Sequence, residues 1–111
     1  MRLAGNKVDG ILVVTVAEKR IDAVVVPDFK SRLGSWIEEG NRKIVLDLFE
    51  VDFIDSSGLG AIVSVLKALE NNGDLVICRV KEPVMGLFRL IRMNRVFQFF
   101  TTVEEATNAF L

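Results

Sequence analysis

Short runs of apolar, mostly β-branched residues alternate with helical patterns along the chain, and these runs predict five strands. The predicted strands are residues 2–8, 11–17, 43–49, 74–80 and 96–99. The first two flank Asp9-Gly10, a pair typical of hairpin turns, so we expect them to be antiparallel neighbours. The third and fourth are almost continuously apolar, which is typical of central strands covered on both faces.

Four segments carry apolar residues at helical spacing. The predicted helices are residues 27–39, 59–70, 83–93 and 102–110. Pro27 and Pro83 open the first and third, where the missing N–H of proline would have no partner anyway. Thr102 and Glu105 have the spacing of a capping box at the start of the fourth helix. Asn94 is suited to a left-handed cap after the third.

The resulting order, β-β-α-β-α-β-α-β-α, predicts an α/β fold. Alternating strands and helices imply a mixed, mostly parallel sheet of about five strands packed by about four helices. A chain of 111 residues has room for one domain and not two, so we expect residues 1–111 to form a single domain.

Composition removes several classes of function. The chain has no histidine, which excludes Ser-His-Asp catalysis, Cys-His catalysis and His-ligated zinc. A formal net charge of -1 argues against direct contact with nucleic acid. The lone cysteine, Cys78, fits a reducing compartment and a buried position. There is no secretory signal, and no apolar run approaches the roughly 18–20 residues of a membrane span, so we expect a cytoplasmic protein.

The stretch most informative about function is residues 51–61, here called the Ser56 segment. It runs from the end of the predicted strand 43–49 into the next helix, and open α/β sheets place functional loops at such carboxyl ends. Two serines and two glycines, Ser56-Ser57-Gly58 and Gly60, put hydroxyls and backbone N–H groups at a helix start. Such a terminus favours an anion such as phosphate by about 0.3–1 kcal/mol.

Three interpretations of this segment compete. The first is structural: Ser56 or Ser57 caps the helix and the glycines permit close packing. The second is the loop of a small enzyme that binds or hydrolyses a nucleotide; this interpretation is weak because no third glycine and no Gly-Lys-Ser/Thr follows. The third is a serine that accepts a phosphoryl group from an external kinase, because the chain offers no base to activate the hydroxyl itself.

Asp55-Ser56-Ser57-Gly58-Leu59-Gly60 resembles the signature loop of STAS domains, specifically that of bacterial anti-sigma factor antagonists. The resemblance extends along nearly the whole chain. Residues 20–23 look like the family segment that leads into its first helix, and residues 43–48 look like its third strand. The chain departs from the family where Lys19-Arg20 replaces a glycine and where Val24-Val25-Val26 replaces small or polar residues; this valine trio is either exposed for a partner or buried.

The resemblance implies a mixed sheet with one antiparallel edge strand, no enzymatic activity and no cofactor. An unphosphorylated antagonist binds an anti-sigma factor that is also a serine kinase and so frees the sigma factor. Phosphorylation of the serine after the loop aspartate, here Ser56, ends the complex, and a PP2C-type phosphatase reverses it. The family fold also suggests that Asp22 lies near Ser56. The expected partner-binding residues are Asp22, Asp55, Ser57, Gly58, Leu59 and Gly60.

The main alternative within the same family is a STAS subunit whose serines are not phosphorylated, working as a scaffold or regulator of a transporter or signalling complex. Outside the Ser56 segment, we expect Asp47 to be satisfied by a local hydrogen bond and Asp52 to be a solvated carboxylate rather than a metal ligand. Trp36 has the spacing of a core residue. A basic cluster near the third helix fits either a solvated face or an acidic partner; it comprises Arg79, Lys81, Arg89, Arg92 and Arg95.

Overall fold

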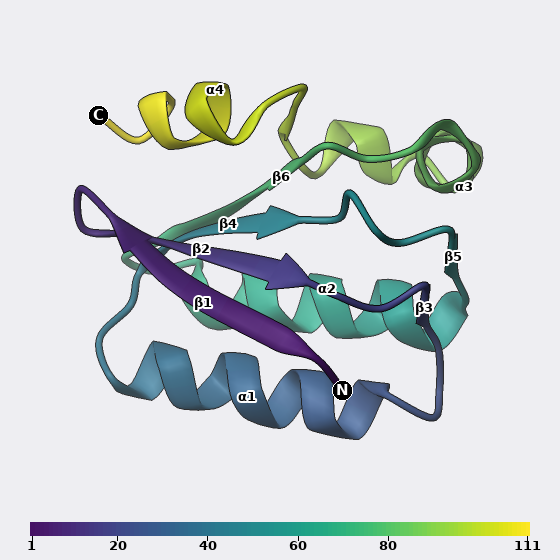
Figure 1. The fold of residues 1–111 in the computed structure, drawn as a ribbon, viewed down its shortest axis with the longest axis horizontal. Coiled ribbons are helices and arrows are strands. Elements are labelled where there is room, and N and C mark those ends of the chain that lie inside the picture. The colour runs from purple at the N-terminus through teal and green to yellow at the C-terminus, as the bar shows by residue number, and fades with distance from the viewer.

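The computed structural model describes residues 1–111 and contains a five-stranded mixed sheet (Figure 1). The strand order is β1-β2-β4-β6-β7, with β1 antiparallel to β2 and all other neighbours parallel. The strands are β1 (Leu3–Val8), β2 (Ile11–Val16), β4 (Lys43–Asp47), β6 (Asp74–Cys78) and β7 (Phe99–Phe100). Asp9 and Gly10 both have positive φ, 52° and 80°, which confirms the predicted hairpin turn.

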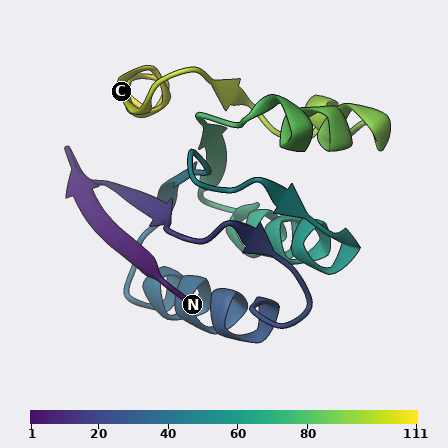
Figure 2. The ribbon, with the colours of Figure 1, turned by 45° about the vertical axis from the view of Figure 1, so that its right-hand side comes forward.

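Helices cover both faces of the sheet (Figures 1 and 2). The helices are α1 (Val26–Glu38), α2 (Ser56–Leu69), α3 (Glu82–Leu90) and α4 (Val103–Asn108). In the figures α1 and α2 lie together under one face, and α4 lies over the other. A core of 23 buried residues fills the side of α1 and α2, and a core of six lies beneath α4. The predicted fold class and element order are confirmed.

One pairing was invisible in the pattern. A second, two-stranded sheet joins β3 (Arg20–Ile21) to β5 (Phe53–Ile54) in parallel. It lies at the carboxyl end of the main sheet, and α3 contacts β5 there (Figure 1). Two residues per strand are too few to give a period, so no sequence pattern could predict this element.

The predicted strand 96–99 is wrong in its bounds. The chain forms a short 3₁₀ turn over Met93–Arg95, and β7 begins only at Phe99. Packing decides this, because Phe97 is buried and its ring lies 6.0 Å from that of Phe88 in an edge-on contact. The left-handed cap is also misassigned, since Arg92, with φ 62°, and not Asn94 adopts that conformation.

The capping box of α4 is half formed. The Thr102 hydroxyl accepts from the Glu105 N–H at 3.0 Å, as predicted. The Glu105 carboxylate, however, accepts from the N–H and the hydroxyl of Thr101, at 3.1 and 2.7 Å, instead of from Thr102. All three hydrogen bonds fix the chain where it turns from β7 into the helix.

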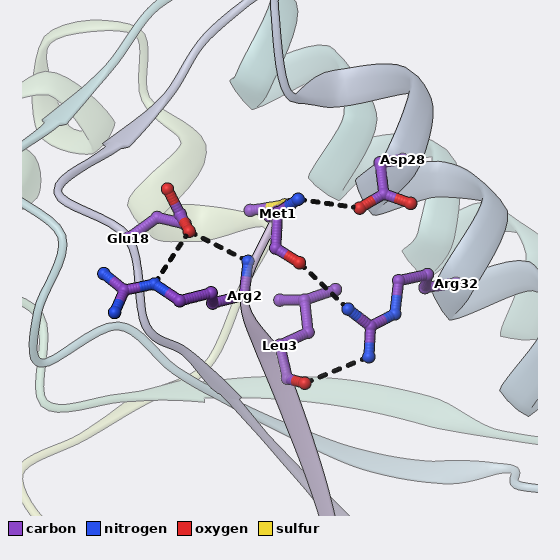
Figure 3. A network of polar contacts seen from close by, with 6 residues as sticks. All are labelled: Met1, Arg2, Leu3, Glu18, Asp28 and Arg32. Carbon is purple, nitrogen blue, oxygen red and sulfur yellow. Dashed lines mark hydrogen bonds and ion pairs between the residues drawn. The ribbon is translucent and has the colours of Figure 1, made fainter.

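A polar network fastens α1 to the first strands (Figure 3). The Arg32 guanidinium donates to the carbonyl oxygens of Met1 and Leu3, both at 3.0 Å. The Glu18 carboxylate accepts from the N–H of Arg2 at 2.8 Å, and this hydrogen bond holds the pKa of Glu18 below its usual value. The network therefore fixes α1 against the edge of the sheet.

Candidate functional site

The Ser56 segment crosses the carboxyl end of the sheet (Figure 2). It contains β5, which pairs with β3, and then continues into α2. Ser56 is the first residue of α2 and is exposed, as is Ser57. Neither serine hydroxyl forms a hydrogen bond within the protein, and the expectation that a serine caps the helix is wrong. Ser56 is therefore an exposed serine whose hydroxyl has no hydrogen-bond partner within the protein.

Asp55 is the residue that caps α2. Its Oδ1 accepts from the N–H of Gly58 at 2.8 Å, and its Oδ2 accepts from the N–H of Ala23 at 3.2 Å. Its own N–H donates to the carbonyl oxygen of Ile21 at 3.2 Å. One carboxylate thus both starts the helix and ties the Ser56 segment to the chain that leads into α1.

The two glycines of this segment have different surroundings. Gly58 is buried against β3, where an added Cβ would collide with the carbonyl oxygen of Ile21 and lie 2.8 Å from Cγ2 of Ile54. Gly60 is exposed, with nothing within 4 Å of such a Cβ. Leu59 is only 7% exposed and packs in the core, so Gly58 and Leu59 shape the segment and offer no side chain to a partner.

Asp22 lies in the turn before α1, and hydrogen bonds link this turn to the Ser56 segment. Its Oδ1 accepts from the N–H of Val24 at 3.1 Å, and its carbonyl accepts from the N–H groups of Val25 and Val26. Val24 is 86% exposed, whereas Val25 and Val26 are half-buried and pack on the core. The valine trio therefore divides into one surface residue and two packing residues. The link to the Ser56 segment is the Ala23–Asp55 hydrogen bond.

Two further residues of the Ser56 segment, Asp52 and Phe53, contact positively charged side chains. Asp52 is paired with Lys81 at 2.8 Å and with Lys19 at 3.8 Å, and the hydrogen bond from Lys81 lowers its pKa. The Arg20 guanidinium lies 4.2 Å from the ring centroid of the half-exposed Phe53. Asp52 is thus a paired carboxylate, and no group of acidic residues or cysteines in the structure could hold a metal ion.

A further ion pair, between Asp47 and Arg79, lies at the carboxyl ends of β4 and β6. Asp47, 2% exposed, accepts from Nε and Nη2 of Arg79 at 3.0 and 2.6 Å. This hydrogen bonding raises the pKa of Arg79 further. The predicted local hydrogen bond is also present, from the Phe49 N–H to Asp47 at 3.2 Å. The bidentate pair joins the ends of β4 and β6, and sequence reasoning missed it because Arg79 looked like one member of a basic cluster.

Comparison with known proteins agrees with this geometry. A family model described as the STAS domain matches residues 3–106. BtrV of Bordetella bronchiseptica, named as an anti-sigma factor antagonist, is 30% identical over 111 residues, which cover 99% of this chain and 95% of BtrV.

Several solved structures resemble the chain, and two of them illustrate the likeness. A Thermotoga maritima protein described as an anti-sigma factor antagonist gives a TM-score of 0.86 at 26% identity, covering 96% of this chain and 92% of its own. Bacillus SpoIIAA in its phosphorylated form shares the fold, with a TM-score of 0.75 at 18% identity and coverage of 99% and 100%.

The chain belongs to the STAS domain family. Within that family it groups with the anti-sigma factor antagonists, as the Ser56 segment predicted. None of the helices has the combination of length and apolar character that a membrane span requires.

Proposed function

We propose that this chain binds a cognate anti-sigma factor, itself a serine kinase, while Ser56 is unphosphorylated, and so releases the sigma factor in the cytoplasm. The names of its relatives support an anti-sigma factor as partner. In this proposal the chain is a binding module, and the kinase supplies the catalysis.

The observation that carries the proposal is the free hydroxyl of Ser56. It stands exposed at the first position of α2, while Asp55 makes the capping hydrogen bond that a serine would otherwise make. A kinase can therefore reach Oγ without unfolding any element. The kinase would transfer the γ-phosphoryl group of ATP to Oγ, and the hydroxyl proton would leave to a base of the kinase.

Phosphorylation would change the electrostatics of the surface sharply. The phosphate adds about -1.5 to -2 charges beside the carboxylate of Asp55 and near the turn that holds Asp22. An interface formed around a neutral serine would lose affinity through repulsion and desolvation. A loss of about 4 kcal/mol weakens binding roughly 1000-fold, which ends a micromolar complex. A PP2C-type phosphatase would restore the serine.

The surface available to the kinase follows from exposure. Ser56, Ser57 and Gly60 are exposed along the first turns of α2, and Val24 projects from the neighbouring turn. The Ala23–Asp55 hydrogen bond holds these two stretches together. We place the docking surface across both, with Asp22 at its edge.

Phosphorylation can be tested with the cognate kinase and ATP by intact mass measurement. We expect one added phosphate on the wild type and none on Ser56→Ala. The matched control Ser57→Ala should still accept one phosphate. An unchanged mass of the wild type would reject the proposal and favour the alternative, an unphosphorylated STAS scaffold or regulatory subunit.

The repulsion mechanism has its own test in Ser56→Asp and Ser56→Asn, which differ mainly in charge. We expect Ser56→Asp to bind the kinase more weakly than Ser56→Asn by calorimetric titration. Both should keep a free energy of unfolding within about 1 kcal/mol of the wild type, as for other exposed changes. Equal affinities for the two variants would contradict a mechanism based on charge.

A further inference from the structure

Away from the Ser56 segment, residues 89–96, here called the α3 corner, place apolar side chains on the surface. Leu90 is 79% exposed, Val96 49% and Ile91 41%, all within seven consecutive residues. Main-chain hydrogen bonds close this corner, from Arg92 N–H to Arg89 and from Val96 N–H to Met93. The apolar residues are therefore held on a folded surface, where clustered exposure marks an interaction site.

The same corner carries an unbalanced positive charge. Between Glu82 and Glu104 the chain has three arginines and no carboxylate, although its formal net charge is -1. Arg89 is paired with Glu82 at 2.5 Å. Arg92 and Arg95 are exposed, and neither has a carboxylate partner within the protein. Along the chain, these two arginines lie between Ile91 and Val96, and neither guanidinium has an ion-pair partner within the protein.

Arg92 also has an unusual backbone. Its φ of 62° lies in the left-handed region, which is unfavourable for a side chain other than glycine or asparagine. A glycine would adopt that conformation without strain, so the fold gains nothing from an arginine at this position. An exposed, strained residue without an internal partner points to a role outside the fold.

We propose that the α3 corner is a second docking surface, which takes an acidic, amphipathic segment of a partner protein. Apolar side chains of that segment would cover Leu90, Ile91 and Val96, and its carboxylates would pair with Arg92 and Arg95. None of these residues belongs to the Ser56 segment. The proposal therefore goes beyond the kinase-binding function and does not depend on it.

Other occupants fit these observations less well. A symmetric dimer through this corner would bring like-charged arginines together with no carboxylate to pair them. A membrane surface usually requires a cluster of about 4–8 basic residues, and the corner has three, one of them already paired. The opposite side of α3 is not available to a partner, because Val84 and Phe88 are buried in the core.

A titration monitored by NMR on the ¹⁵N-labelled full chain tests the proposal. The probe is a synthetic helical peptide with leucines at i, i+3, i+4 and i+7 and glutamates on both sides of them. We expect shifts confined to residues 89–96 and the adjoining turn, and weaker binding at higher salt. A matched peptide with glutamine in place of glutamate should bind at least about fivefold more weakly.

Variants separate docking from folding. Leu90→Gln and Arg92→Gly should each weaken peptide binding at least about fivefold. Arg92→Gly should leave the Tm unchanged or raise it, because it removes the strained conformation. Lys43→Gln, which removes an exposed positive charge at the amino end of β4, should bind as the wild type does.

Four results would overturn the proposal. They are no binding at about 1 mM peptide, equal binding of the glutamine peptide, wild-type affinity in both corner variants, and shifts centred on another surface. Preferential binding to vesicles containing phosphatidylserine, or dimers that Arg92→Gly abolishes, would assign the corner to a membrane or to a second copy instead.

Discussion

Among single residues, Gly58 and Gly60 show how two glycines in one helix can have opposite requirements. Gly58 lies where the start of α2 crosses β3, and a side chain there would meet the carbonyl oxygen of Ile21. Gly60 faces open space two positions later. The spacing of the sequence suggested one role for both, whereas contacts from β3 give close packing to the first alone.

Substitution by alanine should therefore act in opposite directions. We expect Gly58→Ala to lower the free energy of unfolding by about 1–3 kcal/mol through the forced contact with β3. Gly60→Ala should raise it by up to about 1 kcal/mol, because alanine favours the helix interior. Urea unfolding measures both, and a Gly58→Ala protein as stable as Gly60→Ala would contradict the packing described here.

The sequence predicted that the Ser56 segment starts a helix, but it did not show which residue caps that helix. The structural interpretation named only Ser56 and Ser57 as caps, although aspartate is as favourable as serine at an N-cap. The pairing of β3 with β5 decides the matter, since it brings the Ala23 N–H to the second oxygen of Asp55. A contact across 32 residues leaves no local trace in the sequence.

Among the elements, α4 depends on an acidic cap that makes stability sensitive to pH. Hydrogen bonds from Thr101 lower the pKa of the Glu105 carboxyl. A carboxyl whose pKa is lower in the folded state stabilises the fold above its unfolded pKa, about 4.3, and loses that contribution as the pH falls through the folded value.

Glu105→Gln should therefore be less stable than the wild type at pH 7, and the difference should narrow as the pH falls below about 4. Thermal unfolding over a series of pH values provides the measurement. Glu104→Gln is the matched control, because this exposed neighbour accepts no hydrogen bond through its carboxylate. A constant gap between wild type and Glu105→Gln at every pH would argue against the cap.

The hydrophobic pattern of the sequence predicted the strands and helices that bury a regular apolar face. It missed elements whose bounds depend on contacts with other parts of the fold. The apolar runs of β4 and β6 and the helical spacing of α1 gave their places correctly, because each buries a regular face. Residues 96–99 are also mostly apolar, yet Val96 is half exposed while Phe97 packs on Phe88. Aromatic packing from α3 there overrides the strand pattern.

At the scale of the whole molecule, the reactivity of Cys78 is a probe of global unfolding. It is fully buried at the end of β6, between β4 and β7. Burial first, and the charge of Asp47 second, raise the pKa of its thiol to about 12. At pH 8 roughly one thiol in 10⁴ would be ionised, and none is accessible without opening the sheet.

We expect a thiol reagent at pH 8 to label native Cys78 at least about 1000-fold more slowly than the chain unfolded in urea. The native rate should rise with urea in parallel with the unfolding equilibrium. Because Cys78 is the single cysteine, mass measurement follows the reaction directly. Labelling of the folded protein within tenfold of the unfolded rate would show that the carboxyl end of β6 opens locally.

The double hydrogen bonding of Asp55 has a consequence for the thermodynamics of association. Because one carboxylate holds the turn at Ala23 and the start of α2 in a fixed relation, both stretches are ordered before any other protein arrives. When a ligand covers these two stretches, their own conformational entropy therefore falls little further. Asp55 therefore preorganises the surface, and the free energy gained from contacts is available for affinity.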